Sequence, residues 1–241
     1  MSAEENRNQP AAPKPTIIVA IDGPAGAGKS TVARSLARHF GLLNLETGAM
    51  YRAFALKALE QEIPLDNADA LEALTAGTTI VLEPNPKEIR NRVLLDGRDV
   101  TARLRDSDVA EAASRVSVHP AVRAWMVSRQ RGMGAAGGVV MEGRDIGTHV
   151  FPDADVKIFL DAAPDVRGQR RFLQNPGVER SAAAAAAEVR DRDERDRSRA
   201  ASPLVPAADA VHLDTTAMSL EEVCAAAERL VVEKTGFAPV R

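Results

Sequence analysis

Residues 23–30 read Gly-Pro-Ala-Gly-Ala-Gly-Lys-Ser and match the pattern G-x-x-x-x-G-K-S/T at every fixed position. The apolar run at 16–21 before them is typical of a buried strand, and residues 31–40 carry apolar side chains at helical spacing before Gly41. A strand, a glycine-rich loop and a helix in this order present backbone N–H groups and the positive end of the helix to one anion. The segment therefore predicts a phosphate-binding loop as the element around which the chain folds.

The residue types in this loop suit a bound triphosphate. Gly23, Gly26 and Gly28 have no side chain that would block the approach of phosphate to the backbone. Lys29 is expected to reach the β- and γ-phosphates as a point charge, and the Ser30 hydroxyl is placed to help hold a bridging Mg²⁺. We therefore predict Lys29 as a catalytic residue and Ser30 as a metal ligand. The triphosphate-binding set in this part of the chain is Gly23, Pro24, Ala25, Gly26, Ala27, Gly28, Lys29, Ser30 and Thr31.

Apolar segments farther along the chain predict the rest of a sheet. With 16–21 they make about five strands that alternate with helical segments, which predicts a parallel sheet covered by helices on both faces. Polar residues and glycines at 142–148 follow one of these strands, at the kind of edge where open α/β sheets bind ligands. The further strands are expected at 42–45, 139–141, 156–160 and 210–213, and the helices at about 47–61 with Thr47 as N-cap, 107–118, 120–131 and 179–199.

Residues 66–106 depart from this alternation of strands and helices. The stretches 78–82 and 92–100 alternate apolar and polar side chains, and the second contains the turn signal Asp96-Gly97. This pattern predicts a small antiparallel hairpin sheet inserted into the α/β domain.

Bulk composition sets limits on the class of protein. A chain of 241 residues with 45% hydrophobic content can bury the core of one α/β domain with an insertion. The net charge of −3 gives no global basic field for nucleic acid or an anionic membrane, and no apolar segment approaches membrane-spanning length. The single cysteine, Cys224, can form no intrachain disulfide, and the histidines lack metal-ligand spacing. We expect a cytoplasmic monomer that binds no nucleic acid, membrane or zinc, with a disordered leader at 1–15.

A phosphate-binding loop alone is compatible with a motor, a switch, a transporter subunit or a small-molecule kinase. Transfer of a phosphoryl group to another phosphate brings two anions together and requires several fixed arginines. The chain has arginines at the ends of predicted elements, and charged residues at i, i+4 and i+7 along one side of the helix at 179–199. Taken alone, the charged segment 190–199 is equally compatible with a solvated helix surface held by salt bridges. The arginines and their helical partners are Arg52, Arg123, Arg144, Arg192, Asp196 and Arg199.

Five segments of the chain carry a further signal: 21–31, 47–52, 143–148, 151–154 and 192–199. Together they resemble the bacterial cytidylate kinases, over about residues 16–235. The insertion at 66–106 also looks like the extended monophosphate-binding subdomain of that family. The resemblance implies an α/β P-loop kinase fold and in-line transfer of the γ-phosphoryl group of Mg·ATP to CMP and dCMP, which yields CDP and dCDP.

The resemblance also implies a division of the chain into parts. A nucleoside monophosphate kinase domain at 16–235 follows the leader, and a short tail at 236–241 ends the chain. Within the domain, the core is expected at 16–46, 107–163 and 200–235, the monophosphate-binding subdomain at about 47–106, and a lid over ATP at about 164–180, with a tight turn at 175–177.

Specific residues take roles by the same resemblance. Thr47, Arg123 and Asp196 would contact the cytosine edge of CMP, while Arg52, Arg144 and Arg192 would contact its phosphate. Asp145 and Arg199 would contact the sugar or a neighbouring phosphate, and Tyr51 completes the CMP-binding set. Arg144 and Arg192 are also expected to be catalytic, and Arg167 and Arg171 to bind ATP from the lid. Glu142 is compatible with a structural role or with organising Mg²⁺ through water.

Two alternatives to this function remain open from the sequence. A related kinase acting on UMP, AMP or shikimate would differ in the hairpin insertion and in the pair Asp196 and Arg123. A nucleotide-dependent switch would bind ATP and a partner protein without turnover, and it would produce ADP slowly or not at all with every small acceptor.

Overall fold

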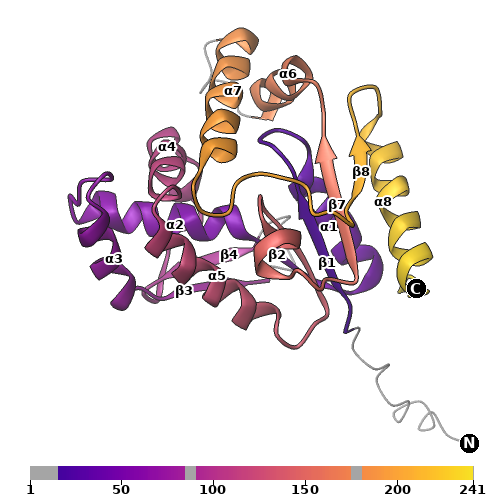
Figure 1. The fold of residues 1–241 in the computed structure, drawn as a ribbon, viewed down its shortest axis with the longest axis horizontal. Coiled ribbons are helices and arrows are strands. Elements are labelled where there is room, and N and C mark those ends of the chain that lie inside the picture. The colour runs from indigo at the N-terminus through magenta and orange to yellow at the C-terminus, as the bar shows by residue number, and fades with distance from the viewer. Residues whose placement is uncertain (1–15, 85–90, 175–180, 241) are drawn as a thin grey trace, which may run out of the picture.

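The computed structural model describes residues 16–84, 91–174 and 181–240, and its centre is a five-stranded parallel sheet (Figure 1). The strand order is β2-β6-β1-β7-β8, so β1, which leads into the glycine-rich loop, lies in the middle. The predicted parallel sheet is confirmed, but each strand ends one residue later than expected, on an aspartate or glutamate. Backbone pairing continues into these acidic residues, which an apolar pattern leaves out. The strands are β1 (Ile18–Asp22), β2 (Leu43–Glu46), β6 (Val139–Glu142), β7 (Val156–Asp161) and β8 (Val211–Asp214).

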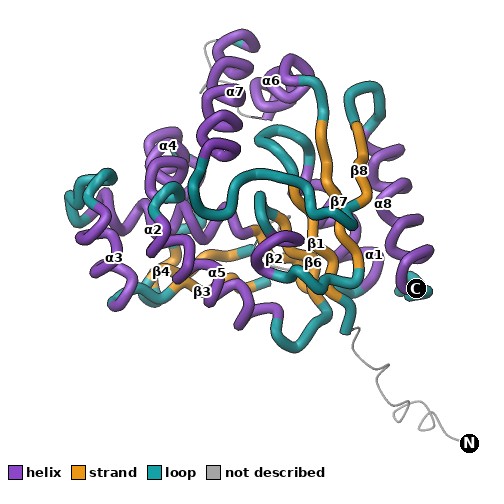
Figure 2. Tube along the Cα trace, viewed as in Figure 1, coloured by secondary structure: helices purple, strands orange, loops and turns teal. Residues whose placement is uncertain are grey.

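Helices cover both faces of this sheet (Figure 2). Val19 and Ile21 of β1 pack with α1 (Lys29–Phe40) and α8 (Leu220–Thr235), whereas Ala20 between them belongs to the core on the opposite face. Side chains alternate in this way because successive residues of a strand point to opposite faces. The second core is closed by α2 (Thr47–Glu60), α4 (Ser107–Val116) and α5 (Pro120–Gly134).

The insertion contains the predicted antiparallel sheet and a helix that the sequence pattern missed. Its strands are β3 (Ile80–Glu83), β4 (Arg92–Leu95) and β5 (Arg98–Asp99), and the missed helix is α3 (Ala68–Ala76). Asp96 and Gly97 between β4 and β5 both have positive φ, 50° and 82°, as a tight hairpin turn requires. The buried Lys57 of α2 donates to the carboxylate of Asp96 at 2.6 Å and so joins the hairpin turn to α2.

Two helices lie above the carboxyl edge of the sheet, and they are close together. They are α6 (Pro164–Gln174) and α7 (Ala182–Ser198), with Ser181 as the N-cap of α7. A Cβ at Gly168 would lie 2.5 Å from the Cβ of Ala186, so only glycine allows this approach of α6 to α7. The expected turn at 175–177, the start of the predicted helix at 179 and the leader at 1–15 fall outside the described residues.

The ends of several helices differ from the sequence prediction for local reasons. Thr47 is the first residue of α2 and not its N-cap, which is Glu46. The helix α4 ends two residues before the predicted Val118, close to Pro120, whose ring disfavours helical backbone just before it. The helix α5 extends past the predicted Arg131 to Gly134, which packs against the ring of Phe151. The helices α2 and α4 share one core, although the sequence prediction places them in different parts of the chain on either side of residue 107. The division into core and monophosphate-binding subdomain therefore stays a prediction.

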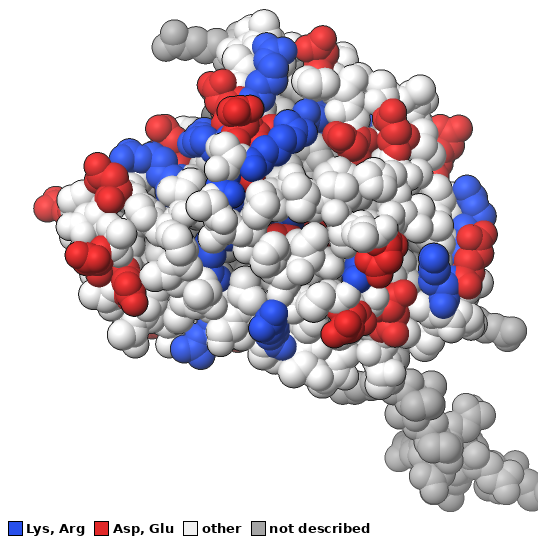
Figure 3. Space-filling model, in the orientation of Figure 1, with Lys and Arg blue, Asp and Glu red and all other residues white. Residues whose placement is uncertain are grey.

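The surface has charges of both signs. Figure 3 shows acidic and basic side chains mixed over the visible face, which agrees with the small net charge of the chain. Within 16–84, 91–174 and 181–240, none of the helices is long and apolar enough to cross a membrane.

Candidate functional site

The glycine-rich loop between β1 and α1 is tightly enclosed. Gly23 has φ of 145°, and a Cβ there would lie 1.9 Å from the carbonyl oxygen of Leu160 on β7. Gly26 has φ of 76°, and a Cβ there would lie 2.9 Å from the carbonyl oxygen of Arg167. Both positions therefore require glycine, and the loop is held between the sheet edge and α6.

Lys29 starts α1 and is buried, with 5% of its surface exposed. Its Nζ donates to the carbonyl oxygen of Pro24 at 2.7 Å. Burial, followed by the positive charge of Arg144, lowers the pKa of Lys29 to about 7. A negative charge beside Lys29, as a bound phosphate would supply, would stabilise the charged form of its amine.

Ser30 and Glu142 place two oxygens side by side at the end of β6. The Oγ of Ser30 donates to the Oε1 of Glu142 at 2.6 Å, and both residues line the cavity described in the next paragraph. The backbone carbonyl of Glu142 accepts from the Oγ1 of Thr47 at 2.7 Å, which explains why that hydroxyl does not cap α2. Hydroxyl and carboxylate oxygens are the ligands that Mg²⁺ prefers, so this pair fits a magnesium ion. In the described part of the chain, no group of three or more His, Cys, Asp or Glu side chains could by itself hold a metal.

One cavity brings together side chains from the glycine-rich loop, α2, α4, α5, the segment after β6, and α7. All nine residues of the predicted CMP-binding set line it, and so do five of the predicted ATP set: Ala25, Gly26, Lys29, Ser30 and Arg171. The nine are Thr47, Tyr51, Arg52, Arg123, Arg144, Asp145, Arg192, Asp196 and Arg199.

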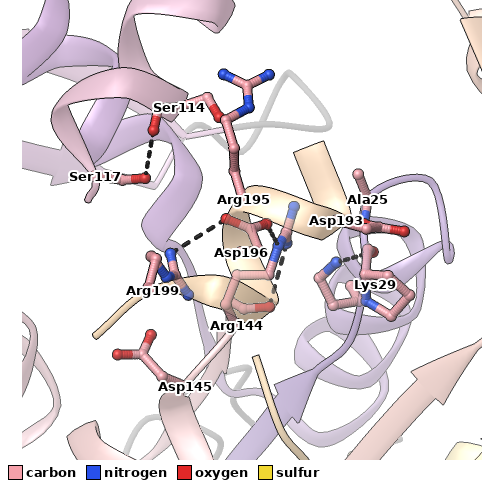
Figure 4. Close-up of polar contacts among 12 residues, drawn as sticks. Ala25, Lys29, Ser114, Ser117, Arg144, Asp145, Asp193, Arg195, Asp196 and Arg199 are labelled. Carbon is pink, nitrogen blue, oxygen red and sulfur yellow. Dashed lines mark hydrogen bonds and ion pairs between the residues drawn. The ribbon is translucent and has the colours of Figure 1, made fainter. Parts of the chain in front are cut away.

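Asp196 of α7 organises two of the cavity arginines (Figure 4). Its Oδ2 accepts from the Nε of Arg144 at 2.7 Å, and its Oδ1 accepts from the Nη1 of Arg199 at 3.2 Å. Although burial would raise it, these arginines together with Arg192 hold the pKa of Asp196 below its ordinary value. Asp196 and the C-cap residue Arg199, which the sequence places on the same side as Arg192, thus line the same cavity as Arg192.

Arg192 itself lies among other cations. Burial, followed by the positive charge of Arg144, lowers the pKa of Arg192 to about 9. Lys29 and Arg192 therefore both experience the charge of Arg144, and the cavity between them favours an anion.

A second buried pair closes the far end of the cavity. The Nη2 of Arg123 on α5 donates to the Oδ2 of Asp145, and the guanidinium carbon of Arg123 lies 5.6 Å from the centroid of the Tyr51 ring. The Nε atoms of Arg123 and Arg199 are buried and have no hydrogen-bond partner within the described residues. These atoms are donors that remain available to a ligand.

The segment that carries Arg144 and Asp145 is attached to β1 by Asp22. The two oxygens of Asp22 accept from the backbone N–H groups of Ile146 at 2.8 Å and Gly147 at 2.7 Å. Burial raises the pKa of Asp22 to about 6, even though both hydrogen bonds favour the carboxylate.

Sequence reasoning missed several residues that line the cavity. Ser114 of α4 and its C-cap residue Ser117 contribute, as does Arg105 just before the helix. The Oγ of Ser114 is buried and makes no hydrogen bond within the part of the chain that the structure describes, whereas Ser117 donates to the carbonyl oxygen of Ser114. The spacing of Ala110, Ser114 and Ser117, at i, i+4 and i+7, could have indicated a small-residue face on this helix.

The arginines of the predicted lid lie in three different places. Arg171 lines the cavity and pairs with Glu188 at 3.3 Å. Arg170 donates to the carbonyl oxygen of Thr215, just after β8. Arg167 is 2% exposed, does not line the cavity and donates to the carbonyl oxygen of Ala25 in the glycine-rich loop, so its expected contact with ATP stays a prediction.

The chain is similar to proteins of one family. A family model described as cytidylate kinase matches residues 19–233, which include every predicted site residue. The chain is 50% identical over 207 residues to a cytidylate kinase of Pelotomaculum thermopropionicum, which covers 85% of this chain and 91% of the relative. It is 47% identical over 212 residues to a cytidylate kinase of Desulfitobacterium hafniense, and the matched residues cover 87% of this chain and 90% of the relative. A cytidylate kinase of Lysinibacillus sphaericus is 44% identical over 223 residues, which cover 92% of this chain and 99% of the relative.

Proposed function

The chain belongs to the cytidylate kinase family, and we propose that this nucleoside monophosphate kinase transfers the γ-phosphoryl group of ATP to CMP and dCMP. The observation that carries the proposal is the single cavity in which Lys29 of the glycine-rich loop meets Arg144 and Arg192. A donor held by the loop and an acceptor held by the arginines would share these cations.

The reaction is proposed to need positioning and charge rather than a strong base. A phosphate monoester with its second pKa near 6 is largely ionised at neutral pH, so CMP needs no proton removed before it attacks. Lys29 would neutralise the donor phosphates, and Arg144 and Arg192 would stabilise the charge that develops on the moving phosphoryl group. Asp196 would hold Arg144 in place, because its oxygens are already used by arginines.

The proposed site for magnesium is the pair Ser30 and Glu142. We propose that the hydroxyl of Ser30 holds the ion directly and that Glu142 orients its water, which gives Glu142 a role that the sequence left open. A bound Mg²⁺ would supply positive charge to the donor phosphates.

Recognition of cytosine is assigned to the end of the cavity near α4 and α5. The unpartnered Nε of Arg123 and the neighbouring Arg199 would donate to the carbonyl oxygen and ring nitrogen of the base. The Oγ of Ser114 and the carboxylate of Asp145 would accept from the exocyclic amine. This assignment differs from the roles that the resemblance implies, in which Asp196 contacts cytosine and Asp145 and Arg199 contact the sugar or a neighbouring phosphate, because both oxygens of Asp196 already accept from arginines. Uracil has a carbonyl in place of that amine, so the carboxylate of Asp145, which can only accept, would disfavour UMP.

Closure over the donor is assigned to the predicted lid at about 164–180, whose described part is α6. Arg171 lines the cavity from α6 and would approach the phosphates of ATP. Exclusion of water at this point would limit hydrolysis of ATP in the absence of CMP.

The experiment is release of ADP from Mg·ATP with CMP, dCMP, UMP, AMP and shikimate offered separately. Rapid turnover limited mainly to CMP and dCMP is expected. Faster turnover with AMP, UMP or shikimate would replace the proposed acceptor. Background release with every acceptor would favour a nucleotide-dependent switch, for which a partner protein should then be sought.

A further inference from the structure

The helix that carries Arg192 and Asp196 of the acceptor side also contacts the glycine-rich loop. Asp193, the residue after Arg192 on α7, is 1% exposed and does not line the cavity. Its Oδ1 accepts from the backbone N–H of Ala25 at 3.1 Å, and the two residues lie next to each other in Figure 4. A carboxylate from α7 therefore bonds directly to the loop predicted to hold the donor.

Arg167 of α6 completes this contact. Its Nη1 donates both to the Oδ2 of Asp193 and to the carbonyl oxygen of Ala25, the latter at 2.9 Å. Its Nε donates to the carbonyl oxygen of Ala162 at 2.8 Å, just after β7. The N–H and the C=O of one loop residue are thus held by an ion pair that joins α6 and α7.

The geometry of α7 connects this contact to the acceptor side. Asp193 and Asp196 are three residues apart, so they lie on adjacent parts of the helix surface. Asp193 holds the loop, while Asp196 holds Arg144 and Arg199 in the cavity. The distance between the loop and the acceptor arginines is therefore fixed on α7 itself.

We propose that Asp193 and Arg167 are positioning residues that set the distance and alignment between the bound triphosphate and the acceptor phosphate. The proposal rests on the proposed function, since it needs a donor at the loop and an acceptor at the arginines. It also gives Arg167 a role that differs from the direct contact with ATP expected from the sequence.

Stability alone is a weak explanation of the pair. A buried ion pair is commonly no more stabilising than apolar side chains of the same size, because both charges lose their water. What apolar side chains cannot supply is the pair of hydrogen bonds to Ala25. The pair is therefore expected to matter more for the transfer step than for binding of either nucleotide alone.

The test compares the wild-type enzyme with Asp193→Asn and Arg167→Lys. For each protein, kcat and both KM values are measured well below the unfolding temperature, and the Kd of CMP and of ATP is measured separately by titration calorimetry. A misplacement of about 1 Å can reduce transfer on the order of 100-fold. We expect kcat to fall by about tenfold or more while each separate Kd changes by less than about threefold.

Controls separate positioning from general loss of structure. Asp209→Asn removes another ion pair, between Asp209 and Lys157, away from the loop, and kcat should be unchanged. The double variant Asp193→Leu/Arg167→Met should lose about as much kcat as Asp193→Asn, because two residues that act as a unit do not add. If Asp193→Asn does not fold, Arg167→Lys keeps the charge and supplies the same comparison.

Unchanged kcat in folded Asp193→Asn or Arg167→Lys would overturn the proposal. So would a loss confined to the Kd of ATP, which would mean that the pair only shapes the donor loop. These outcomes leave wild-type turnover of CMP intact. Absence of wild-type turnover of CMP is the different result that rejects the proposed function.

Discussion

Asp196→Asn tests whether one carboxylate organises the acceptor side of the cavity. The substitution keeps the size of a 5% exposed side chain and removes its charge. Asp196 accepts from Arg144 at 2.7 Å and from Arg199 at 3.2 Å, and both bonds are charge-assisted. A hydrogen bond to a charged group is worth about 1.5–3 kcal/mol, against about 1 kcal/mol between neutral groups. Asparagine has one acceptor oxygen and turns an NH2 group toward the second arginine, so one bond is lost and the other is weakened, by about 2 kcal/mol in total.

These two losses predict a specific kinetic result. A total of about 2 kcal/mol corresponds to roughly a 30-fold lower kcat/KM for CMP. The KM for ATP should change by less than about threefold, since within the described residues Asp196 makes no side-chain hydrogen bond to the glycine-rich loop. The assay is coupled ADP release at saturating ATP with CMP varied, and then the reverse.

A matched control is available on the same helix. Asp191 of α7 is exposed, and Asp191→Asn makes the same chemical change without touching the cavity. It should leave both KM values and kcat unchanged. The reasoning is refuted if Asp196→Asn keeps kcat/KM for CMP within about threefold of wild type, or if the KM for ATP rises as much as that for CMP.

Four further predictions follow from single contacts. Gly23→Ala should unfold at a much lower temperature in a thermal scan and lose ATP binding, because its Cβ would lie 1.9 Å from the carbonyl oxygen of Leu160. Ser114→Ala should raise the KM for CMP by roughly three- to tenfold, with the KM for ATP unchanged in steady-state assays, because one hydrogen bond to the base is lost. Lys29 has a pKa of about 7 and would become fully charged beside phosphate, so ATP binding at pH 8 should take up protons and should weaken as pH rises above 7. Calorimetry in buffers of different ionisation enthalpy would detect the proton uptake. The pKa of Asp22 is raised from 3.8 to about 6 in the folded state, so its contribution to stability is present below about pH 4 and is lost as pH rises through 6; the stability of wild type relative to Asp22→Asn in urea unfolding should fall over that range.

Each of these predictions has an outcome that contradicts it. A normally folded Gly23→Ala protein that binds ATP would contradict the close packing of the loop on β7. An equal rise of both KM values in Ser114→Ala would remove that residue from base recognition. Calorimetry without proton uptake, or a pH-independent difference between Asp22→Asn and wild type, would contradict the assigned effect of burial on these groups.

The parts of the fold that the sequence predicted well are those with strong local signals. The glycine-rich loop is defined by its fixed positions, and the five strands by apolar runs between helical segments. The turn at Asp96-Gly97 was visible because few dipeptides adopt positive φ at both positions. Helix α3 was missed because its short segment, Ala68–Ala76, has only two buried side chains and so little periodicity.

The cavity was predicted less completely, because contacts between distant segments leave no local pattern. The residues around it could be named only through the resemblance to a family, and the structure then brought all nine together. The run of alternating charges on α7 does not show which acid faces which partner, and so Asp193 was not singled out and Arg167 was expected at ATP. Ser114 is one of many small residues on α4, and only the structure shows that its hydroxyl is buried without a partner in the described part of the chain.

The central claim is that one cavity holds the ATP donor and the CMP acceptor at the same time. The most direct measurement is inhibition by a molecule in which adenosine and cytidine are joined through their 5′ carbons by an oligophosphate chain. The account predicts inhibition that is competitive with ATP and with CMP, and binding tighter than that of either nucleotide, because both halves occupy adjacent sites. Competition with only one of the two substrates would contradict the claim that Lys29, Arg144 and Arg192 serve both phosphates.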